Sequence, residues 1–237
     1  MAPARGGRQA RRVLPVELHP FAGLRLLVRD PGGDPGGDVE LRTGDVEGLV
    51  ELAAVAARGV HDPGPSPFAV PWTACAPAER ARRTLRWHLL GWGGWSPREW
   101  RLDFVVRRGG VVVGTQSLEA VDFPVLREVV TGSWLGREHQ GRGTGPLMRA
   151  AVLHLAFAGL GASCARSEAF LDNPRSRAVS QRLGYREDGQ RAVVRDGVRA
   201  VQQRLRLDAA DWAAGERPEV LVEGVEPVRE ALLPAAP

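Results

Sequence analysis

The spacing of apolar residues along the chain predicts a mixture of strands and helices. Apolar and polar residues alternate between turn-forming residues in the stretches that we predict to be strands: residues 24–29, 39–42, 100–107, 111–118, 127–135 and 163–171. Apolar residues three and four positions apart predict helices at residues 46–58, 77–90 and 146–159, the first capped by Asp45 and ended by Gly59. We expect the three strands between 100 and 135 to form the centre of an antiparallel sheet.

Several segments lie outside these elements. The proline-rich and apolar loop at 61–72 either lines a pocket or packs over the core. The stretch at 220–228 alternates like a strand, or like an extended arm that reaches another subunit of a homo-oligomer. We divide the chain into a disordered basic tail (1–15), one domain (16–212) and a C-terminal extension (213–237).

Composition narrows the class of protein. With 237 residues, of which 43% are hydrophobic and 25% are charged, the chain suits one sizeable globular domain. No apolar run approaches the roughly 20 residues of a membrane-spanning helix, and the basic start lacks the apolar stretch of a signal peptide. We therefore expect a cytoplasmic protein with no membrane partner. Cys75 and Cys164 lack metal-ligand spacing, which predicts no metal site.

The net charge of +4 is weak evidence for a nucleic-acid partner. The chain has no lysine, so all 32 basic residues are arginine. Most of these arginines are interleaved with aspartate and glutamate, and only residues 5–12 carry a basic cluster. Because a nucleic-acid interface needs a basic face rather than a high arginine content, we expect no nucleic-acid partner.

A glycine-rich turn at 137–145 is the first segment that indicates chemistry. It lies between the strand at 127–135 and the amphipathic helix that follows. Glycines let the backbone approach a ligand closely, and the free N–H groups at a helix start bind phosphate oxygens. A P-loop would need a lysine, and a dinucleotide-binding unit would begin with a parallel βαβ unit rather than an antiparallel meander. The turn therefore predicts a pyrophosphate site of another kind.

Two motifs in this half of the chain resemble those of one enzyme family. The pattern Gln140-x-x-Gly143-x-Gly145 is followed, after a strand, by Asn173-x-x-Ser176 and a Gly-Tyr turn. Together they resemble the ribosomal-protein acetyltransferase-like branch of the GCN5-related N-acetyltransferase (GNAT) superfamily, over residues 24–212. Further segments resemble a mycobacterial GNAT succinyltransferase: residues 59–63, 70–73, 122–124, 132–136 and 148–153.

The resemblance implies a fold and a binding site. The fold is an α/β (α+β) GNAT fold, in which a mixed, mostly antiparallel twisted sheet is splayed at the acyl-CoA site and flanked by helices. The resemblance assigns the following residues to acyl-CoA: Ser133, Trp134, Leu135, Arg137, Gln140, Gly141, Arg142, Gly143, Thr144, Gly145, Asn173 and Ser176. It also places the proline-rich loop over the acyl end, where we expect His61 and Thr73 to contact substrate. Trp72 falls on the acceptor side, where it either lines the acceptor pocket or belongs to the core or a dimer face.

The catalytic roles follow from the same resemblance. Asn173 suits both a helix N-cap and a contact with the pantetheine arm of CoA. Ser176 would donate a hydrogen bond to the departing sulfur, since Tyr185, the only tyrosine, belongs to the Gly-Tyr turn. For the general base we favour Asp122, while Glu119, Glu138, His139 and a water chain remain open.

The predicted activity is transfer of an acyl group from acyl-CoA to a primary amine by direct attack on the thioester. Succinyl-CoA and acetyl-CoA are both open as donors, with a lean to succinyl-CoA. The acceptor is a small molecule or a protein N-terminus. The alternative is a catalytically silent module that binds acyl-CoA and regulates a partner.

Overall fold

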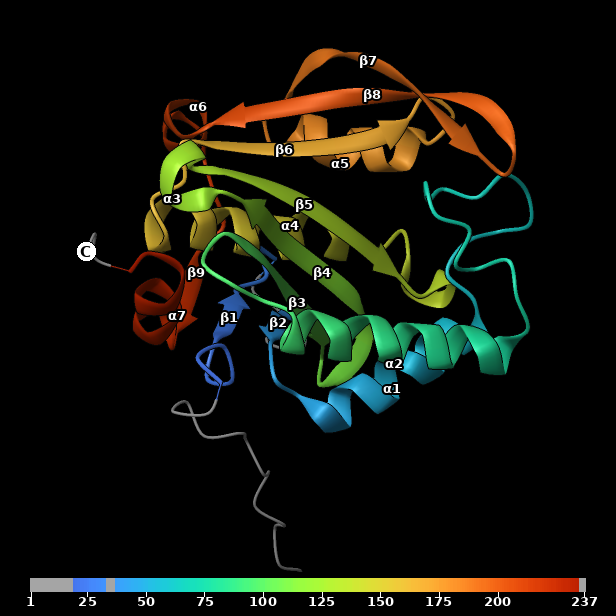
Figure 1. Ribbon diagram of the computed structural model, residues 1–237, viewed down its shortest axis with the longest axis horizontal. Helices are drawn as coiled ribbons and strands as arrows, with labels where there is room; N and C mark the ends of the chain where they lie inside the picture. Colours follow the sequence, from blue (N-terminus) through green and yellow to red (C-terminus); the bar gives the residue numbers. More distant parts are fainter. Residues whose placement is uncertain (1–18, 33–36, 235–237) are drawn as a thin grey trace, which may run out of the picture.

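The structure, a computed structural model, describes residues 19–32 and 37–234 (Figure 1). The predicted tail at 1–15 therefore lies outside the described residues. Within the described residues, the strands are β1 (Arg25–Val28), β2 (Val39–Arg42), β3 (Glu99–Arg108), β4 (Val111–Val121), β5 (Glu128–Leu135), β6 (Cys164–Phe170), β7 (Arg186–Arg195), β8 (Val198–Asp208) and β9 (Val220–Glu223). The helices are α1 (Val46–Arg58), α2 (Pro77–Gly93), α3 (Phe123–Leu126), η2 (Arg137–His139), α4 (Thr144–His154), η3 (Leu155–Gly159), α5 (Pro174–Arg182), α6 (Ala209–Ala214) and α7 (Val225–Leu232).

The described strands form one sheet in the order β7-β8-β6-β5-β4-β3-β2-β1-β9. The pair β5–β6 is parallel and the other strand pairs of the described residues are antiparallel, so the predicted fold class is confirmed. Strands β3, β4 and β5 are central, as their hairpin-like spacing predicted. In the described segments, no helix has both the length and the apolar character needed to cross a membrane.

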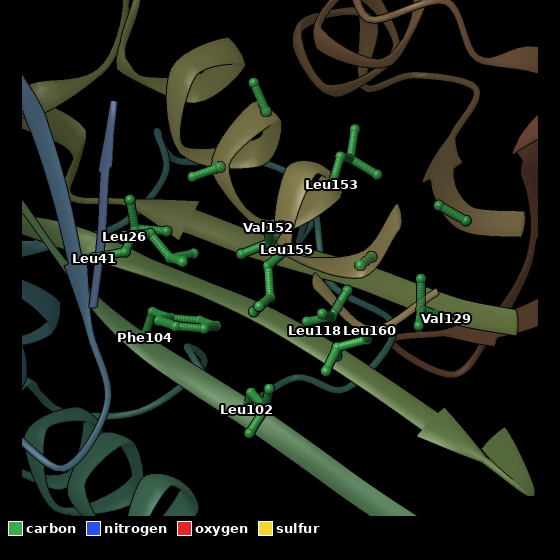
Figure 2. Packing of buried hydrophobic residues seen from close by; sticks show 14 of the residues in the cluster. Leu26, Leu41, Leu102, Phe104, Leu118, Val129, Val152, Leu153, Leu155 and Leu160 are labelled. Atoms are coloured by element: carbon green, nitrogen blue, oxygen red, sulfur yellow. The ribbon is translucent and has the colours of Figure 1, made fainter. Parts of the chain in front are cut away.

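Helices cover both faces of the sheet (Figure 1). On one face, Val152 and Leu155 from α4 and η3 point toward Phe104 and Leu118 of the strands, and all four side chains are fully buried (Figure 2). On the other face, a smaller apolar cluster joins α1 and α2 to β3 and β4. Because successive side chains of a strand point to opposite faces, β3 and β4 supply both layers from alternate residues.

Helix α1 begins and ends where the sequence predicted. The Asp45 carboxylate accepts a hydrogen bond of 2.8 Å from the backbone N–H of Gly48, and Gly59 follows the last turn with φ +121°. Asp45 also pairs with Arg107, whose side chain is 4% exposed. The cap therefore also neutralises a buried charge of β3.

Two helices differ from their predicted bounds. Helix α4 begins at Thr144, two residues before Pro146, because a proline is tolerated throughout the first turn of a helix, where N–H groups have no helical acceptor. Helix α2 continues to Gly93, beyond its predicted end at residue 90. Its buried side chains are Thr84 and His88, whereas Leu89 is 46% exposed.

The C-terminal extension belongs to the sheet of its own chain. Strand β9 pairs antiparallel with β1, so that Val220 lies opposite Val28, and Val228 and Leu232 of α7 are fully buried in the main core. The prediction of a strand is confirmed, whereas the alternative of an arm on another subunit is not: β1 offers an edge that this segment covers.

Strands β5 and β6 separate soon after they meet. Their parallel pairing covers only Glu128–Val130 and Cys164–Arg166. Residues 131–135 of β5 and 167–170 of β6 have no partner strand between them, and we call this opening the β5–β6 gap. The gap is the splayed region that the fold class predicts, and it opens toward the glycine-rich turn and the start of α5.

Candidate active site

The glycine-rich turn leaves open space in front of helix α4. Gly141 and Gly143 have φ values of +74° and +79°, which favour glycine, and a Cβ atom added to either would meet no atom within 4 Å. Gly143 occupies the N-cap position of α4 and forms no side-chain cap hydrogen bond. The first N–H groups of α4 are therefore available to an anion.

Side chains of the turn fix its backbone. The Gln140 amide donates hydrogen bonds to the carbonyl oxygens of Val60 (2.8 Å) and Leu135 (3.0 Å). Arg108 donates to the Thr144 hydroxyl at 3.0 Å, and Thr144 is 2% exposed. Gln140 and Thr144, which we assigned to the cofactor set, thus hold the shape of the turn with their side chains.

Three arginines surround the turn. Arg137 and Arg142 are exposed and form no ion pair with the described residues. Arg175, from the first turn of α5, donates to the Gln140 side-chain oxygen at 3.3 Å. Positive charges beside free helix N–H groups suit a pyrophosphate.

The start of helix α5 lies beside the start of α4. The Asn173 side-chain oxygen accepts a hydrogen bond of 3.2 Å from the Ser176 N–H, so the predicted N-cap is confirmed. A Cβ on Gly145 would lie 3.4 Å from the Val179 side chain of α5. Ser176 is partly buried in the first turn of α5, so the structure brings it together with the glycine-rich turn at the mouth of the gap.

The proline-rich loop folds onto the end of β5. The ring of Trp72 lies 5.6 Å from the ring of Trp134, and the His61 Nε2 atom lies 2.9 Å from the Thr73 hydroxyl. The loop is anchored by Arg80, which donates to the Thr73 and Cys75 carbonyl oxygens. The structure therefore brings His61, Trp72 and Thr73 together beside the end of β5 that borders the gap.

A pocket of about 400 Å³ lies on the face of the sheet that carries α2. Trp95, Trp100, Val130 and Arg166 are among its lining residues. Glu119 of β4 also lines it, directly opposite Val130, the last residue of β5 that pairs with β6. The pocket therefore ends where the gap begins.

The Glu119 carboxyl has no hydrogen bond or ion pair with the described residues. Burial raises the pKa of Glu119 above its ordinary value, Arg101 opposes this rise, and Asp103 adds to it. A partly buried carboxyl with a raised pKa is suited to accept a proton near neutral pH.

Comparison with known proteins identifies the family. Residues 39–186 match the acetyltransferase (GNAT) domain. The chain belongs to the GNAT acetyltransferase family. It is therefore an acyl-CoA-dependent N-acyltransferase, and acyl-CoA is its co-substrate.

Solved structures of GNAT proteins share the fold. Mycobacterium smegmatis RimJ in complex with CoA-disulfide is 21% identical, with a TM-score of 0.60 over 83% of this chain and 94% of that chain. A GCN5-related N-acetyltransferase from Brucella melitensis is 20% identical, with a TM-score of 0.60 over 79% and 80%. RimL, a ribosomal alpha-N-protein acetyltransferase in complex with coenzyme A, is 20% identical, with a TM-score of 0.53 over 72% and 93%.

The structure does not bring Asp122 to the other predicted site residues of this GNAT domain. Asp122 occupies the N-cap position of α3, before β5, and its carboxylate pairs with Arg98 at 2.9 Å. Ser176 follows the far end of β6, which runs parallel to β5. A strand as long as β5 spans about 25 Å, so α3 and the start of α5 lie at opposite ends of these two strands (Figure 1).

The remaining base candidates differ in their surroundings. Glu138 is exposed and pairs with Arg58 at 2.7 Å, and this hydrogen bond lowers the pKa of Glu138. His139 lies beside Glu138, with 3.4 Å between the ring nitrogen and the carboxylate. Neither lines the α2 pocket. Among these carboxyls, only Glu119 combines burial, a free carboxylate and proximity to the gap, and sequence offered no signal that separated it from the others.

Proposed function

We propose that this GNAT enzyme moves an acyl group from acyl-CoA to a primary amine, with the Ser176 hydroxyl as the hydrogen-bond donor to the leaving sulfur. One observation carries the proposal: the open glycine-rich turn of α4 and the first turn of α5 meet at the mouth of the β5–β6 gap. Through this gap, a long cofactor bound by its phosphates at the turn would reach into the sheet.

Binding starts at the turn. The pyrophosphate would bind the first N–H groups of α4, with Arg137, Arg142 and Arg175 as counter-charges. The pantetheine arm would pass Asn173 and enter the gap. There, backbone groups of β5 that face β6 have no partner strand and need one.

The chemical step is direct attack. The nitrogen of a neutral amine forms a bond to the thioester carbonyl carbon, which backbone N–H groups of residues 133–135 polarise. The carbon–sulfur bond then breaks, the electron pair passes to sulfur, and the Ser176 hydroxyl donates a hydrogen bond to it. Glu119, at the inner end of the gap, takes up the proton that the amine loses, directly or through water.

The donor and acceptor follow from the surroundings of the gap. We lean to succinyl-CoA over acetyl-CoA, because a free acyl carboxylate needs polar partners and the His61–Thr73 pair stands at that end of the site. The α2 pocket combines apolar lining residues such as Trp95 and Trp100 with charged ones, among them the free Glu119 carboxylate. It therefore suits an amine that carries an apolar neighbour, on a small molecule or at a protein N-terminus.

Release of free thiol tests the activity. The enzyme is mixed with acetyl-CoA or succinyl-CoA and a panel of amines and N-terminal peptides, and thiol is measured with a chromogenic disulfide. We expect amine-dependent release that Ser176→Ala suppresses. Tight CoA binding without release from any donor and amine would favour the silent regulatory module instead.

A further inference from the structure

Arg149 is a buried cation in an otherwise apolar stretch of helix α4. It is 4% exposed, and its neighbours from Met148 to Leu153 are buried hydrophobic residues. None of the carboxylates in the described parts of the chain forms an ion pair with it. The loss of hydration lowers the pKa of Arg149, but a guanidinium starts so high that it stays protonated. An unbalanced charge at this depth is costly.

Serine hydroxyls take the place of an acid around this guanidinium. It donates to Ser180 of α5 at 2.9 Å, to Ser133 of β5 at 3.1 Å and to Ser167 of β6 at 3.4 Å. Ser133 and Ser167 stand on opposite sides of the β5–β6 gap. The charge therefore lies at the floor of the gap, on the face covered by α4.

The hydrogen bonds from Arg149 also orient the hydroxyl protons. Each serine oxygen accepts from the guanidinium, so its own proton must point elsewhere. The Ser180 proton has an acceptor, the Ser176 carbonyl oxygen at 3.4 Å. The protons of Ser133 and Ser167 have none among the described residues. They remain as donors for a group in the gap.

Tyr185 does not neutralise the charge. Its phenol is 5% exposed, and its oxygen lies 3.3 Å from the Thr131 hydroxyl. Burial raises the pKa of Tyr185 above its ordinary value, so the phenol is neutral at physiological pH. Thr131, Gln116 and Gln203, which are further buried polar side chains on this face, are uncharged.

We infer that Arg149 is a positioning residue that stabilises the negative charge of the leaving CoA thiolate, through the hydroxyls of Ser133 and Ser167. The inference rests on the proposed function. As the carbon–sulfur bond breaks, its electron pair moves to sulfur inside the gap. The guanidinium keeps its proton throughout and supplies the missing opposite charge, in a site too dry to screen it.

The test measures the pKa of the CoA thiol in the binary complex, from the ultraviolet absorbance of the thiolate. In the native enzyme we expect a value below that of free CoA, and Arg149→Met should raise it by about one unit, as loss of a nearby opposite charge does. In Arg149→Met, turnover should fall roughly 100-fold. The affinity for CoA should change little when it is measured at about pH 6, because the thiol is then protonated. Arg149→Lys, which keeps the charge, should restore part of both.

Two further variants separate this role from a structural one. Arg182→Met removes an exposed arginine of α5 and should leave the pKa of the bound thiol unchanged. Ser133→Ala keeps the guanidinium but removes one donor, so it should raise the pKa of the bound thiol by a smaller amount. This variant keeps the inference testable even if Arg149→Met fails to fold.

An unchanged thiol pKa in both Arg149→Met and Ser133→Ala would overturn the inference. So would a loss of affinity confined to succinyl-CoA, because the guanidinium would then pair with the acyl carboxylate. Neither measurement needs turnover, so failure of the proposed acyl transfer is seen separately, as absence of thiol release by the native enzyme.

Discussion

Gly143 offers a direct test of the phosphate site, because the chain contains a matched control. Gly143 and Gly161 have φ values of +79° and +70°, and a Cβ on either would meet no atom within 4 Å. Aspartate at either position costs about 1 kcal/mol or somewhat more in backbone strain. Both variants should therefore lose a similar free energy of unfolding, and they differ in place alone: Gly161 lies between η3 and β6, beyond the far end of α4.

The expected effect on binding is electrostatic. An aspartate at residue 143 would stand about 5 Å from a bound pyrophosphate, where one pair of unit charges in water repels by about 0.8 kcal/mol. With two phosphate charges the repulsion is about 1.6 kcal/mol, which corresponds to a roughly 15-fold larger dissociation constant. Salt should reduce the penalty, since the turn is exposed.

Calorimetric titration with CoA at low and high salt measures this effect, and urea unfolding measures the strain. Gly143→Asp should weaken CoA binding, while Gly161→Asp should bind like the native enzyme at equal loss of stability. Equal CoA affinities of the two variants would refute a phosphate site at this turn.

Further predictions concern catalysis. Ser176→Ala should lower kcat by roughly ten- to several-hundred-fold and leave acyl-CoA affinity nearly unchanged; native turnover would remove Ser176 from the mechanism. With one accepted amine, kcat/KM should be at least as high for succinyl-CoA as for acetyl-CoA. A tenfold preference for acetyl-CoA, about 1.4 kcal/mol, would contradict succinyl-CoA as the favoured donor. Glu119→Gln should abolish the acid limb of the kcat/KM profile. Because the pKa of Glu119 is raised in the folded state, its stabilising contribution is present in acid and lost as pH rises. In denaturant unfolding, Glu119→Gln should therefore be more stable than the native enzyme at neutral pH and equal to it below about pH 4.

Local pattern was sufficient for most of the elements. Strands β3 and β4 were predictable because their alternating residues flank Gly109 and Gly110, which form the turn. The capping residue Asp45 and the proline at the start of α2 predicted where these two helices begin. Pairing across long separations was not predictable in this way: β9 joins β1 through contacts about 200 residues apart in sequence, and nothing local specifies that edge.

The site divides along the same line. The residues of the turn, Asn173 and Ser176 lie in two short segments, each at a helix start. Their positions could therefore be predicted from neighbours in sequence, and the family resemblance implied their roles. A general base could not be predicted in this way. Its ability to accept a proton depends on how deeply the carboxyl is buried and on which charges lie near it in space. Asp122 and Glu119 are three residues apart, yet one pairs with Arg98 in an exposed turn and the other faces a pocket without a partner.

Arg149 shows most clearly why residue type alone was uninformative. In a chain whose 32 basic residues are all arginine, an arginine among apolar residues reads as one more surface charge on an amphipathic helix. Its role is apparent only from its surroundings in the fold. The side chain is buried away from water, and no carboxylate among the described residues pairs with it. Arg107 is equally buried, but Asp45 and Glu51 balance it, so its energetic role is complete within the chain. The charge of Arg149 is balanced only if an anion enters the β5–β6 gap, and the anion that acyl transfer itself produces there is a thiolate.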